Sequence, residues 1–355
     1  MVTHMAIISS IGTSVPRHRF SQSEAKQFIS QYTNESLQKY LAVFDQAAID
    51  TRYFAADREW LHSENKLSDR HQLWFEEGLN LAQEAVENCL GNYDQSLEID
   101  AIISVTSTGI LTPSFDAHLI NELQLSSSIK RMPMFGLGCA GGAIGLARAY
   151  DYLKAHPDES LLLVCCELAS TAFHPRDLTK KDIVGAAIFS DGAAAVLLLG
   201  ANHDLVKQSE GCTVQINTTD SKLLPDSLDV MGWDVKDDGF HVVFSQKIPR
   251  LVNSFWAPQV QEFLERNNLT QNDLNFVVAH PGGKKIIEQL EDIIPDLLKL
   301  DTAKSVLRQF GNMSSPTVLF VLQSYINQEL KQGDKGLLTA LGPGFSSEIL
   351  LLEVI

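Results

Sequence analysis

The stretch "FGLGCAGGAIGLARAYDYL", residues 135–153, sets one cysteine among glycines directly before an apolar pattern of helical period. Its first glycines also have the G-x-G-x-x-G spacing of a dinucleotide-binding turn. Such a turn should close the first strand of a βαβ unit and precede an acidic residue at the end of the next strand. Here the stretch lies deep in the chain, and Asp158 and Glu159 precede the next apolar run. Nucleotide binding is therefore disfavoured, and Cys139 is either a packing residue or a nucleophile on a helix.

A second stretch, "GNMSSPTVLFVLQSYI" (311–326), repeats this helix start and sets Asn312 where the first stretch has Cys139. Ser107 ends an apolar strand 32 residues before Cys139, and His280 ends another strand 32 residues before Asn312. This repeated order indicates an internal duplication. We expect the two helices to pair back to back, with His280 approaching both helix starts from a loop.

Apolar strand-like runs alternate with helical patterns along the chain, which predicts an α/β layered architecture. A chain of 355 residues is long enough to bury a sizeable core in two structural halves. We expect the first half to span residues 1–205 and to carry the cysteine. The second half then spans residues 206–355 and carries the histidine and the asparagine.

The formal net charge of −16 argues against nucleic acid or an anionic membrane as the main partner. No apolar run reaches the length of a membrane span, and the N-terminal residues lack a signal-peptide pattern. We therefore expect a cytoplasmic protein without membrane insertion. The cysteines are Cys89, Cys139, Cys165, Cys166 and Cys212; their number is odd and they lack metal-type pairs, so we expect no disulfides.

Cys139, His280 and Asn312 in one pocket form a set suited to acyl transfer and decarboxylation. A helix N-terminus favours a thiolate, and neighbouring glycines leave room for substrate. The cysteine would hold an acyl group as a thioester, while histidine and asparagine donate hydrogen bonds to a thioester oxygen. Taken singly, His280 is as compatible with a turn residue, and Asn312 with a helix N-cap.

Five motifs carry a family resemblance: "GCAGG" with Cys139, "FSDGAAAV" (189–196), "AHPGG" with His280, "GNMSSPTVLFVL" with Asn312, and "GPGFSSE" (342–348). From about residue 5 to its end, the chain resembles the type III polyketide synthases, the chalcone synthase-like enzymes of the thiolase superfamily. The segment "DVMGWDVKDDGF" (229–240) is similar to bacterial alkylpyrone synthases. The "HPGG" and "GPGFSSE" motifs argue against the ketoacyl synthase III branch, which shares the Cys-His-Asn set.

The resemblance implies a five-layer αβαβα thiolase-like fold, a homodimer, acyl-CoA and malonyl-CoA as substrates, and no metal or organic cofactor. It implies Cys139 as the acyl-accepting nucleophile. His280 would keep the thiolate and, with Asn312, polarise the malonyl thioester during decarboxylation. Pro113 matches a loop that reaches toward the partner subunit and often carries a cis peptide bond.

The resemblance also implies an aromatic gate at Phe189, between the CoA tunnel and the cavity. A second gate residue falls at Val242, which leaves one aromatic gate. The remaining substrate-pocket positions are Ser107, Ala169, Ala172, Trp233, Ser314, Gly342, Pro343 and Gly344. Small side chains at Ala169 and Ala172 indicate an alkyl starter, and Trp233 replaces a glycine of the plant enzymes. For the CoA phosphates the candidates are Arg52, Lys284 and Lys285.

These observations predict an acyltransferase that loads a medium- or long-chain acyl-CoA on Cys139. Repeated decarboxylative condensations with malonyl-CoA would give a tri- or tetraketide that cyclises to an alkylpyrone, or by aldol closure to an alkylresorcinol. Two alternatives stay open at this point. One is a single-condensation ketosynthase III-like acyltransferase, and the other is a catalytically silent scaffold of the same fold.

Overall fold

The computed structural model describes residues 5–91, 93, 97–176, 178–208, 213–294, 300–328 and 330–355. Within these ranges, nine strands form one mixed sheet in the order β11-β12-β13-β8-β1-β7-β6-β4-β5. The strands are β1 (Ala6–Ser14), β2 (His18–Ser21), β3 (Thr51–Phe54), β4 (Ala101–Thr106), β5 (Lys130–Phe135), β6 (Ser160–Leu168), β7 (Asp191–Gly200), β8 (Val214–Leu223), β9 (Met231–Lys236), β10 (Gly239–Phe244), β11 (Phe276–Ala279), β12 (Lys335–Gly342) and β13 (Ser346–Val354).

The sheet order confirms the duplication. In the first half β4 pairs parallel with β6, which pairs antiparallel with β7. In the second half β11 pairs parallel with β12, which pairs antiparallel with β13. The two halves meet where β1 pairs antiparallel with β8, so their strands form one continuous sheet.

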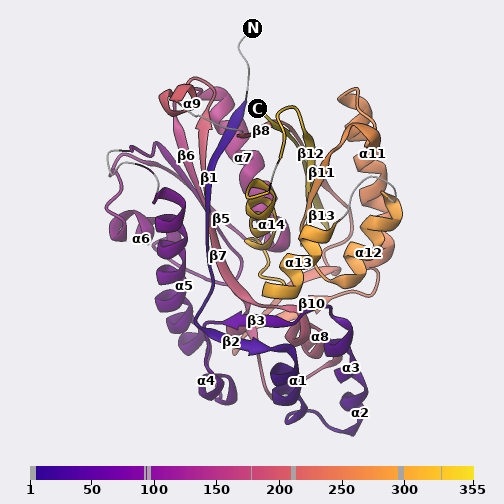
Figure 1. Ribbon diagram of the computed structural model, residues 1–355. Coiled ribbons are helices and arrows are strands. Elements are labelled where there is room, and N and C mark those ends of the chain that lie inside the picture. The colour runs from indigo at the N-terminus through magenta and orange to yellow at the C-terminus, as the bar shows by residue number, and fades with distance from the viewer. Residues whose placement is uncertain are drawn as a thin grey trace.

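Two helices from equivalent positions of the repeat lie between the halves. Figure 1 shows α7 and α14 side by side at the centre, with strands of the first half on one side and strands of the second half on the other. Helix α5 covers the outer face of the first half, and α11 and α12 lie on the outer side of the second half. This succession of layers is the predicted αβαβα arrangement. The helices are α1 (Gln22–Ser30), α2 (Glu35–Gln38), α3 (Ala42–Gln46), α4 (Arg58–His62), α5 (Leu67–Leu90), α6 (Phe115–Glu122), α7 (Gly141–Ala155), α8 (Lys180–Ile188), α9 (Asp204–Gln208), α10 (Ile248–Leu251), α11 (Ala257–Arg266), α12 (Lys284–Ile293), α13 (Asp301–Phe310) and α14 (Thr317–Ile326).

Burial explains the composition of the inner elements. Every residue of β6, "SLLLVCCEL", is buried, as expected for a strand covered by helices on both faces. In α7, glycines and alanines dominate the buried face, which permits close contact with α14 and with strands of both halves. The core therefore surrounds the start of these two helices.

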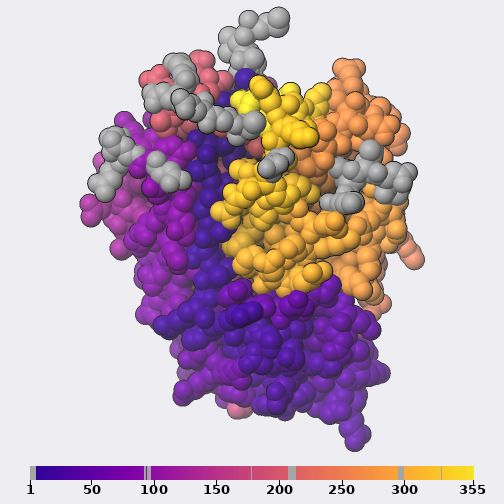
Figure 2. Space-filling view, in the orientation of Figure 1, coloured from indigo at the N-terminus to yellow at the C-terminus, as the bar shows by residue number. Residues whose placement is uncertain are grey.

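A smaller lobe lies below the sheet. Helices α1, α2, α3 and α8 and the short β2–β3 ribbon form it, and the β9–β10 hairpin packs against α8. Figure 2 shows this indigo and purple lobe directly beneath the orange and yellow second half. The lobe supplies one wall of the cavities described below.

Several single features bear on the sequence predictions. The Thr112–Pro113 peptide bond is cis. Cys89, Cys139, Cys165 and Cys166 are free thiols, and Cys212 lies outside the described residues. Across the described ranges, no helix combines the length and apolar character needed to cross a membrane.

Candidate active site

Cys139 lies in a short 3-10 turn (Gly138–Ala140) between strand β5 and helix α7. Gly138 has a φ of 50°, and a Cβ atom there would lie 2.7 Å from the Pro343 ring. A Cβ at Gly142 would lie 2.4 Å from the Ser315 carbonyl oxygen. The glycines therefore admit the backbone of the second half against the start of α7.

Asn312 meets Cys139 across the interface between the halves. Its side-chain oxygen and nitrogen each lie 3.8 Å from the Cys139 sulfur. The Asn312 amide is held in place because its oxygen accepts from the Ser314 backbone N–H (2.8 Å) and its nitrogen donates to the Gly282 carbonyl (3.1 Å). The pairing predicted from the duplication thus brings together residues 173 positions apart.

His280 follows β11 and lines the same cavity as Cys139 and Asn312. Its backbone N–H donates to the Thr339 carbonyl at 2.9 Å, which fixes the start of the loop. Both ring nitrogens are buried and have no hydrogen-bond partner within the described part of the chain. The imidazole is therefore able to exchange hydrogen bonds with a substrate placed beside Cys139.

Burial sets the ionisation of this pair. It raises the pKa of the Cys139 thiol to about 11, although hydrogen bonds with Ser314 and Asn312 oppose the change. It also lowers the pKa of His280 to about 3. Desolvation of the buried thiol thus opposes the stabilisation of a thiolate by the helix N-terminus.

Glu167, which the sequence analysis missed, lies behind the Cys139 turn at the end of β6. Its carboxylate accepts hydrogen bonds from the Ser107 backbone N–H (2.9 Å), the Thr108 hydroxyl (2.8 Å) and the Ser315 hydroxyl (2.9 Å). Burial raises the pKa of Glu167 to about 7. The available signal was a lone acidic residue inside the otherwise apolar run "LLLVCCEL".

Ser107 belongs to this network rather than to a substrate pocket. Its hydroxyl accepts the Gly138 backbone N–H at 2.7 Å, so it links Glu167 to the Cys139 turn. Ser107 lies outside the lining of both cavities described next. Its predicted place in the pocket wall is therefore corrected to a place behind the nucleophile.

Two cavities lie in this part of the molecule, and Cys139 lines one of them. The first, here called the thiol cavity, has an empty volume of about 540 Å³, part of it open to solvent. The second, here called the lower cavity, has an empty volume of about 700 Å³, also partly open. The thiol cavity is lined by Cys139, Met231, Phe244, Ile248, Trp256, His280, Gly282, Ile286, Leu290, Asn312, Thr339, Ala340 and Leu341. The lower cavity is lined by Phe20, Ala25, Phe28, Ile29, Arg52, Phe54, Leu61, Ala169, Ser170, Ala172, Phe173, His174, Asp182, Gly185, Ala186, Phe189, Trp233 and Val242.

Phe189 stands between the two cavities. Its ring centroid lies 5.5 Å from that of Phe244 in the thiol cavity and 5.8 Å from that of Trp233 in the lower cavity. Two further rings, those of Phe244 and Trp233, therefore adjoin the predicted gate residue Phe189. Phe244 was missed although it stands two residues after Val242, on the same face of the strand.

The β9–β10 hairpin supplies the wall that both cavities share. In its register Met231 pairs with Phe244, and Trp233 pairs with Val242. Residues two apart on a strand point to the same face, so one face of the hairpin lines both cavities in succession. Trp233 and Val242 thus both line the lower cavity.

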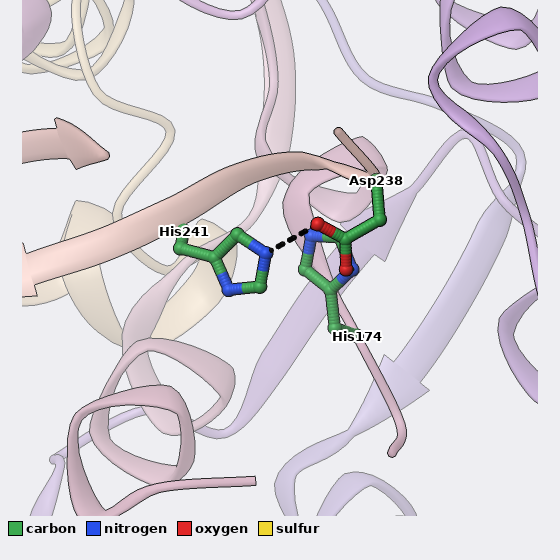
Figure 3. Close-up of side chains that lie close together, drawn as sticks. All are labelled: His174, Asp238 and His241. Carbon is green, nitrogen blue, oxygen red and sulfur yellow. Dashed lines mark hydrogen bonds and ion pairs between the residues drawn. The ribbon is translucent and has the colours of Figure 1, made fainter. Parts of the chain in front are cut away.

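A polar cluster fastens this hairpin to the loop after Ala172 (Figure 3). The Asp238 carboxylate lies 2.9 Å from the His241 ring, and the rings of His241 and His174 stack at 4.1 Å. Their ligand atoms lie within 4.8 Å of one another, as in a metal site. However, the two rings are within 10° of parallel and Arg70 already contacts His174 Nδ1 at 3.1 Å. Two imidazoles stacked face to face cannot both direct an in-plane lone pair at one ion, so the cluster acts as a hydrogen-bonded clamp.

The other residues predicted to line the substrate pocket lie in different places. Ala169 and Ala172 line the lower cavity. Ser314, with a φ of 61°, lies beside the thiol and hydrogen-bonds it. In the loop of Gly342, Pro343 and Gly344, a Cβ at Gly342 would lie 2.6 Å from the Ala140 side chain. The loop therefore packs on the Cys139 turn.

The three candidate CoA-phosphate ligands do not form one cluster. Lys284 and Lys285 are exposed at the start of α12, between Gly282 and Ile286 of the thiol cavity. Arg52 is only 1% exposed and lines the lower cavity instead. It therefore stands apart from the two lysines as a candidate CoA-phosphate ligand.

Comparisons with known proteins agree with this geometry. Residues 2–203 match the N-terminal domain of chalcone and stilbene synthases, and residues 215–355 match the C-terminal domain. The chain is 40% identical to a putative chalcone synthase of Bacillus subtilis, over 98% of this chain and 99% of the relative. It is 31% identical to the alpha-pyrone synthesis polyketide synthase-like Pks18 of Mycobacterium tuberculosis, over 99% of this chain and 92% of the relative. The crystal structure of 1,3,6,8-tetrahydroxynaphthalene synthase from Streptomyces coelicolor, a bacterial type III polyketide synthase, superposes with a TM-score of 0.87 at 26% identity, covering 98% of this chain and 99% of that one.

Proposed function

Because this chain belongs to the chalcone and stilbene synthase family and is a type III polyketide synthase, an enzyme of the acyltransferase class, we propose that its starter is a medium- or long-chain acyl-CoA. One observation carries the proposal. The lower cavity behind Phe189 is lined mainly by apolar side chains, as ligand pockets usually are. An alkyl chain would be buried there while its thioester stays beside Cys139.

Loading begins with the acyl-CoA thioester in the thiol cavity. The Cys139 sulfur forms a bond to the acyl carbon, and the bond to the CoA sulfur breaks. His280 accepts the thiol proton and returns it to the departing CoA thiolate, so no net charge is created. The neutral imidazole set by burial is the form that can accept this proton.

Extension then uses malonyl-CoA in the same cavity. The bond between the carboxylate and the methylene carbon breaks, carbon dioxide leaves, and the electron pair forms a thioester enolate. His280 and the Asn312 side-chain N–H groups donate hydrogen bonds to the enolate oxygen. The enolate carbon attacks the Cys139 acyl thioester and returns the cysteine as a thiolate, which regains a proton before the extended chain is reloaded.

Two or three rounds give a tri- or tetraketide. The enol oxygen at carbon 5 then attacks the thioester carbon, which releases an alkylpyrone and regenerates Cys139. The relative Pks18, named for alpha-pyrone synthesis, supports this product class. The enlarged cavity beside Ala169 and Ala172 supports an alkyl substituent on the ring.

Two further parts of the proposal concern partners. Lys284 and Lys285 flank the thiol cavity and are suited to bind the CoA phosphates. A homodimer is supported by Ile110 and Phe135, two large apolar side chains that are 50% and 58% exposed near the ends of β4 and β5. Exposed apolar side chains of this size mark association surfaces when they gather on one face.

A starter panel tests the function. Acyl-CoA esters of increasing length are incubated with malonyl-CoA, and products are identified by mass spectrometry. We expect alkylpyrones from medium and long chains and none from a Cys139→Ala variant. One β-ketoacyl product per starter would favour a single-condensation enzyme, and extension of aromatic starters alone would refute the alkyl assignment.

A further inference from the structure

Two buried arginines of this protein differ in how their donors are used. Arg70 donates from Nε to the Asn65 carbonyl and from Nη1 to the carbonyls of Thr171 and Phe173. Its Nη2 contacts the His174 ring. Arg70 is therefore fully engaged by the protein, as expected for an arginine that serves packing alone.

Arg52 is more deeply buried than Arg70, but only one of its guanidinium nitrogens donates hydrogen bonds within the described part of the chain. Its Nη1 donates to the Ala186 carbonyl and, at 3.2 Å, to the Phe189 carbonyl. Its Nε and Nη2 groups are buried and have no hydrogen-bond partner within the described part of the chain. Leaving such donors unpaired in the interior is costly, so a partner for them is expected.

The nearest acid does not supply that partner. Asp191 lowers the cost of burying the Arg52 charge through space. Its carboxylate, however, accepts from the backbone N–H groups of Ala55 and Ser170, each at 2.8 Å, and from the Ser170 hydroxyl. The Arg52 guanidinium remains a cation at neutral pH, because burial lowers its pKa only to about 9.

The position of Arg52 points to the ligand. It lines the lower cavity, with its guanidinium 5.3 Å from the Phe54 ring centroid. Its stem lies against Gly311, where a Cβ atom would be 2.9 Å from Arg52 Cγ. Gly311 precedes Asn312, whose backbone pairs with that of Phe189. Arg52 therefore stands directly behind the gate, in a cavity that is otherwise mostly apolar.

We propose that Arg52 binds an oxygen of the acyl chain that occupies the lower cavity, so that the site selects chains carrying a keto or carboxylate oxygen over purely alkyl chains. The proposal rests on the proposed function and deepens it by naming a substrate feature. Two sources provide such an oxygen. One is the keto group of the growing chain, and the other is a carboxylate at the far end of the starter.

Loading assays distinguish these sources. Octanoyl-CoA, 3-oxooctanoyl-CoA and suberoyl-CoA are compared for the rate of Cys139 acylation, followed by intact-protein mass spectrometry without malonyl-CoA. The measured quantity is selectivity, the loading efficiency of each oxygen-bearing starter divided by that of octanoyl-CoA. Comparing this ratio between variants cancels the intrinsic reactivity of each thioester.

We expect Arg52→Met to lower the selectivity for at least one oxygen-bearing starter by about tenfold or more, because a hydrogen bond from a charged donor is lost. Loss for 3-oxooctanoyl-CoA identifies the keto oxygen, and loss for suberoyl-CoA identifies the carboxylate. Arg52→Lys retains a cation and should lose less. Arg266→Met, at an exposed arginine of α11 outside both cavities, should leave the selectivity unchanged.

Selectivities within twofold of wild type for both starters in Arg52→Met and Arg52→Lys would overturn the proposal. If neither variant folds, isotope-edited infrared spectra of the wild-type acyl-enzyme decide. A labelled keto or carboxylate band shifted toward a charge-assisted hydrogen bond supports it, and bands unshifted from those in an apolar solvent overturn it. Absence of acylation with every starter would instead count against the proposed function.

Discussion

Replacing Ala172 with leucine tests whether the lower cavity holds the acyl chain and limits its length. The new side chain adds three carbon atoms to a wall of that cavity. If these atoms displace three methylenes of a long chain, each costs about 0.8 kcal/mol of lost burial, or about 2.4 kcal/mol in all. That corresponds to about a 60-fold loss in kcat/KM for chains long enough to reach Ala172, and to little change for shorter ones.

The assay is kcat/KM for acyl-CoA starters of increasing length, measured for wild type and Ala172→Leu. Ala155→Leu is the matched control, because Ala155 is exposed at the end of α7 and outside both cavities. The loss must begin at a definite chain length and stay constant beyond it. An equal loss for all lengths, or no loss for the longest, would refute the assignment of the cavity to the acyl chain.

Three further predictions follow from ionisation and charge. Alkylation of Cys139 by iodoacetamide should rise about tenfold per pH unit between pH 7 and 10, because only the thiolate reacts and the thiol pKa is about 11; a plateau below pH 9 would reveal a thiolate paired with a charged His280. Glu167 has a raised pKa of about 7 in the folded state, so wild type loses stability between pH 5 and 8 by about 3 kcal/mol at this one group. Glu167→Gln should not lose this stability. Urea unfolding at pH 5 and at pH 8 measures the free energy of unfolding of both proteins, and that of the variant should rise relative to that of wild type between the two pH values. Replacing Lys284 and Lys285 together by alanine should raise KM for CoA thioesters at low salt but not for N-acetylcysteamine thioesters, which lack the phosphates; equal effects on both would remove the lysines from the CoA site.

The sequence predicted the meeting of Cys139 and Asn312 because the duplication relates their helix starts. A repeat constrains which elements are equivalent, and equivalent elements of a layered fold meet at its centre. The five-layer order was implied by the family resemblance rather than by the repeat. The continuity of the sheet through β1 and β8 was not predicted, because strand pairing between the halves leaves no periodic signal.

The residues missed or misplaced depend on contacts between segments far apart in sequence. Arg52 was named with the two lysines as a candidate for the CoA phosphates, and only its packing with α8 explains its burial. Phe244 was not named, although it stands two residues after Val242 on the same strand. The ionisation of Cys139 depends on the balance of burial against the helix N-terminus, which no local motif specifies.

The hairpin register has a consequence for which cavity a substitution changes. Two successive cross-strand pairs of the β9–β10 hairpin line different cavities. The Met231–Phe244 pair lines the thiol cavity, and the Trp233–Val242 pair lines the lower cavity, beyond Phe189. Within the described residues, the β9–β10 hairpin is not hydrogen-bonded to the main sheet. Substitutions of Trp233 or Val242 would therefore change the wall of the lower cavity without replacing any residue that lines the thiol cavity.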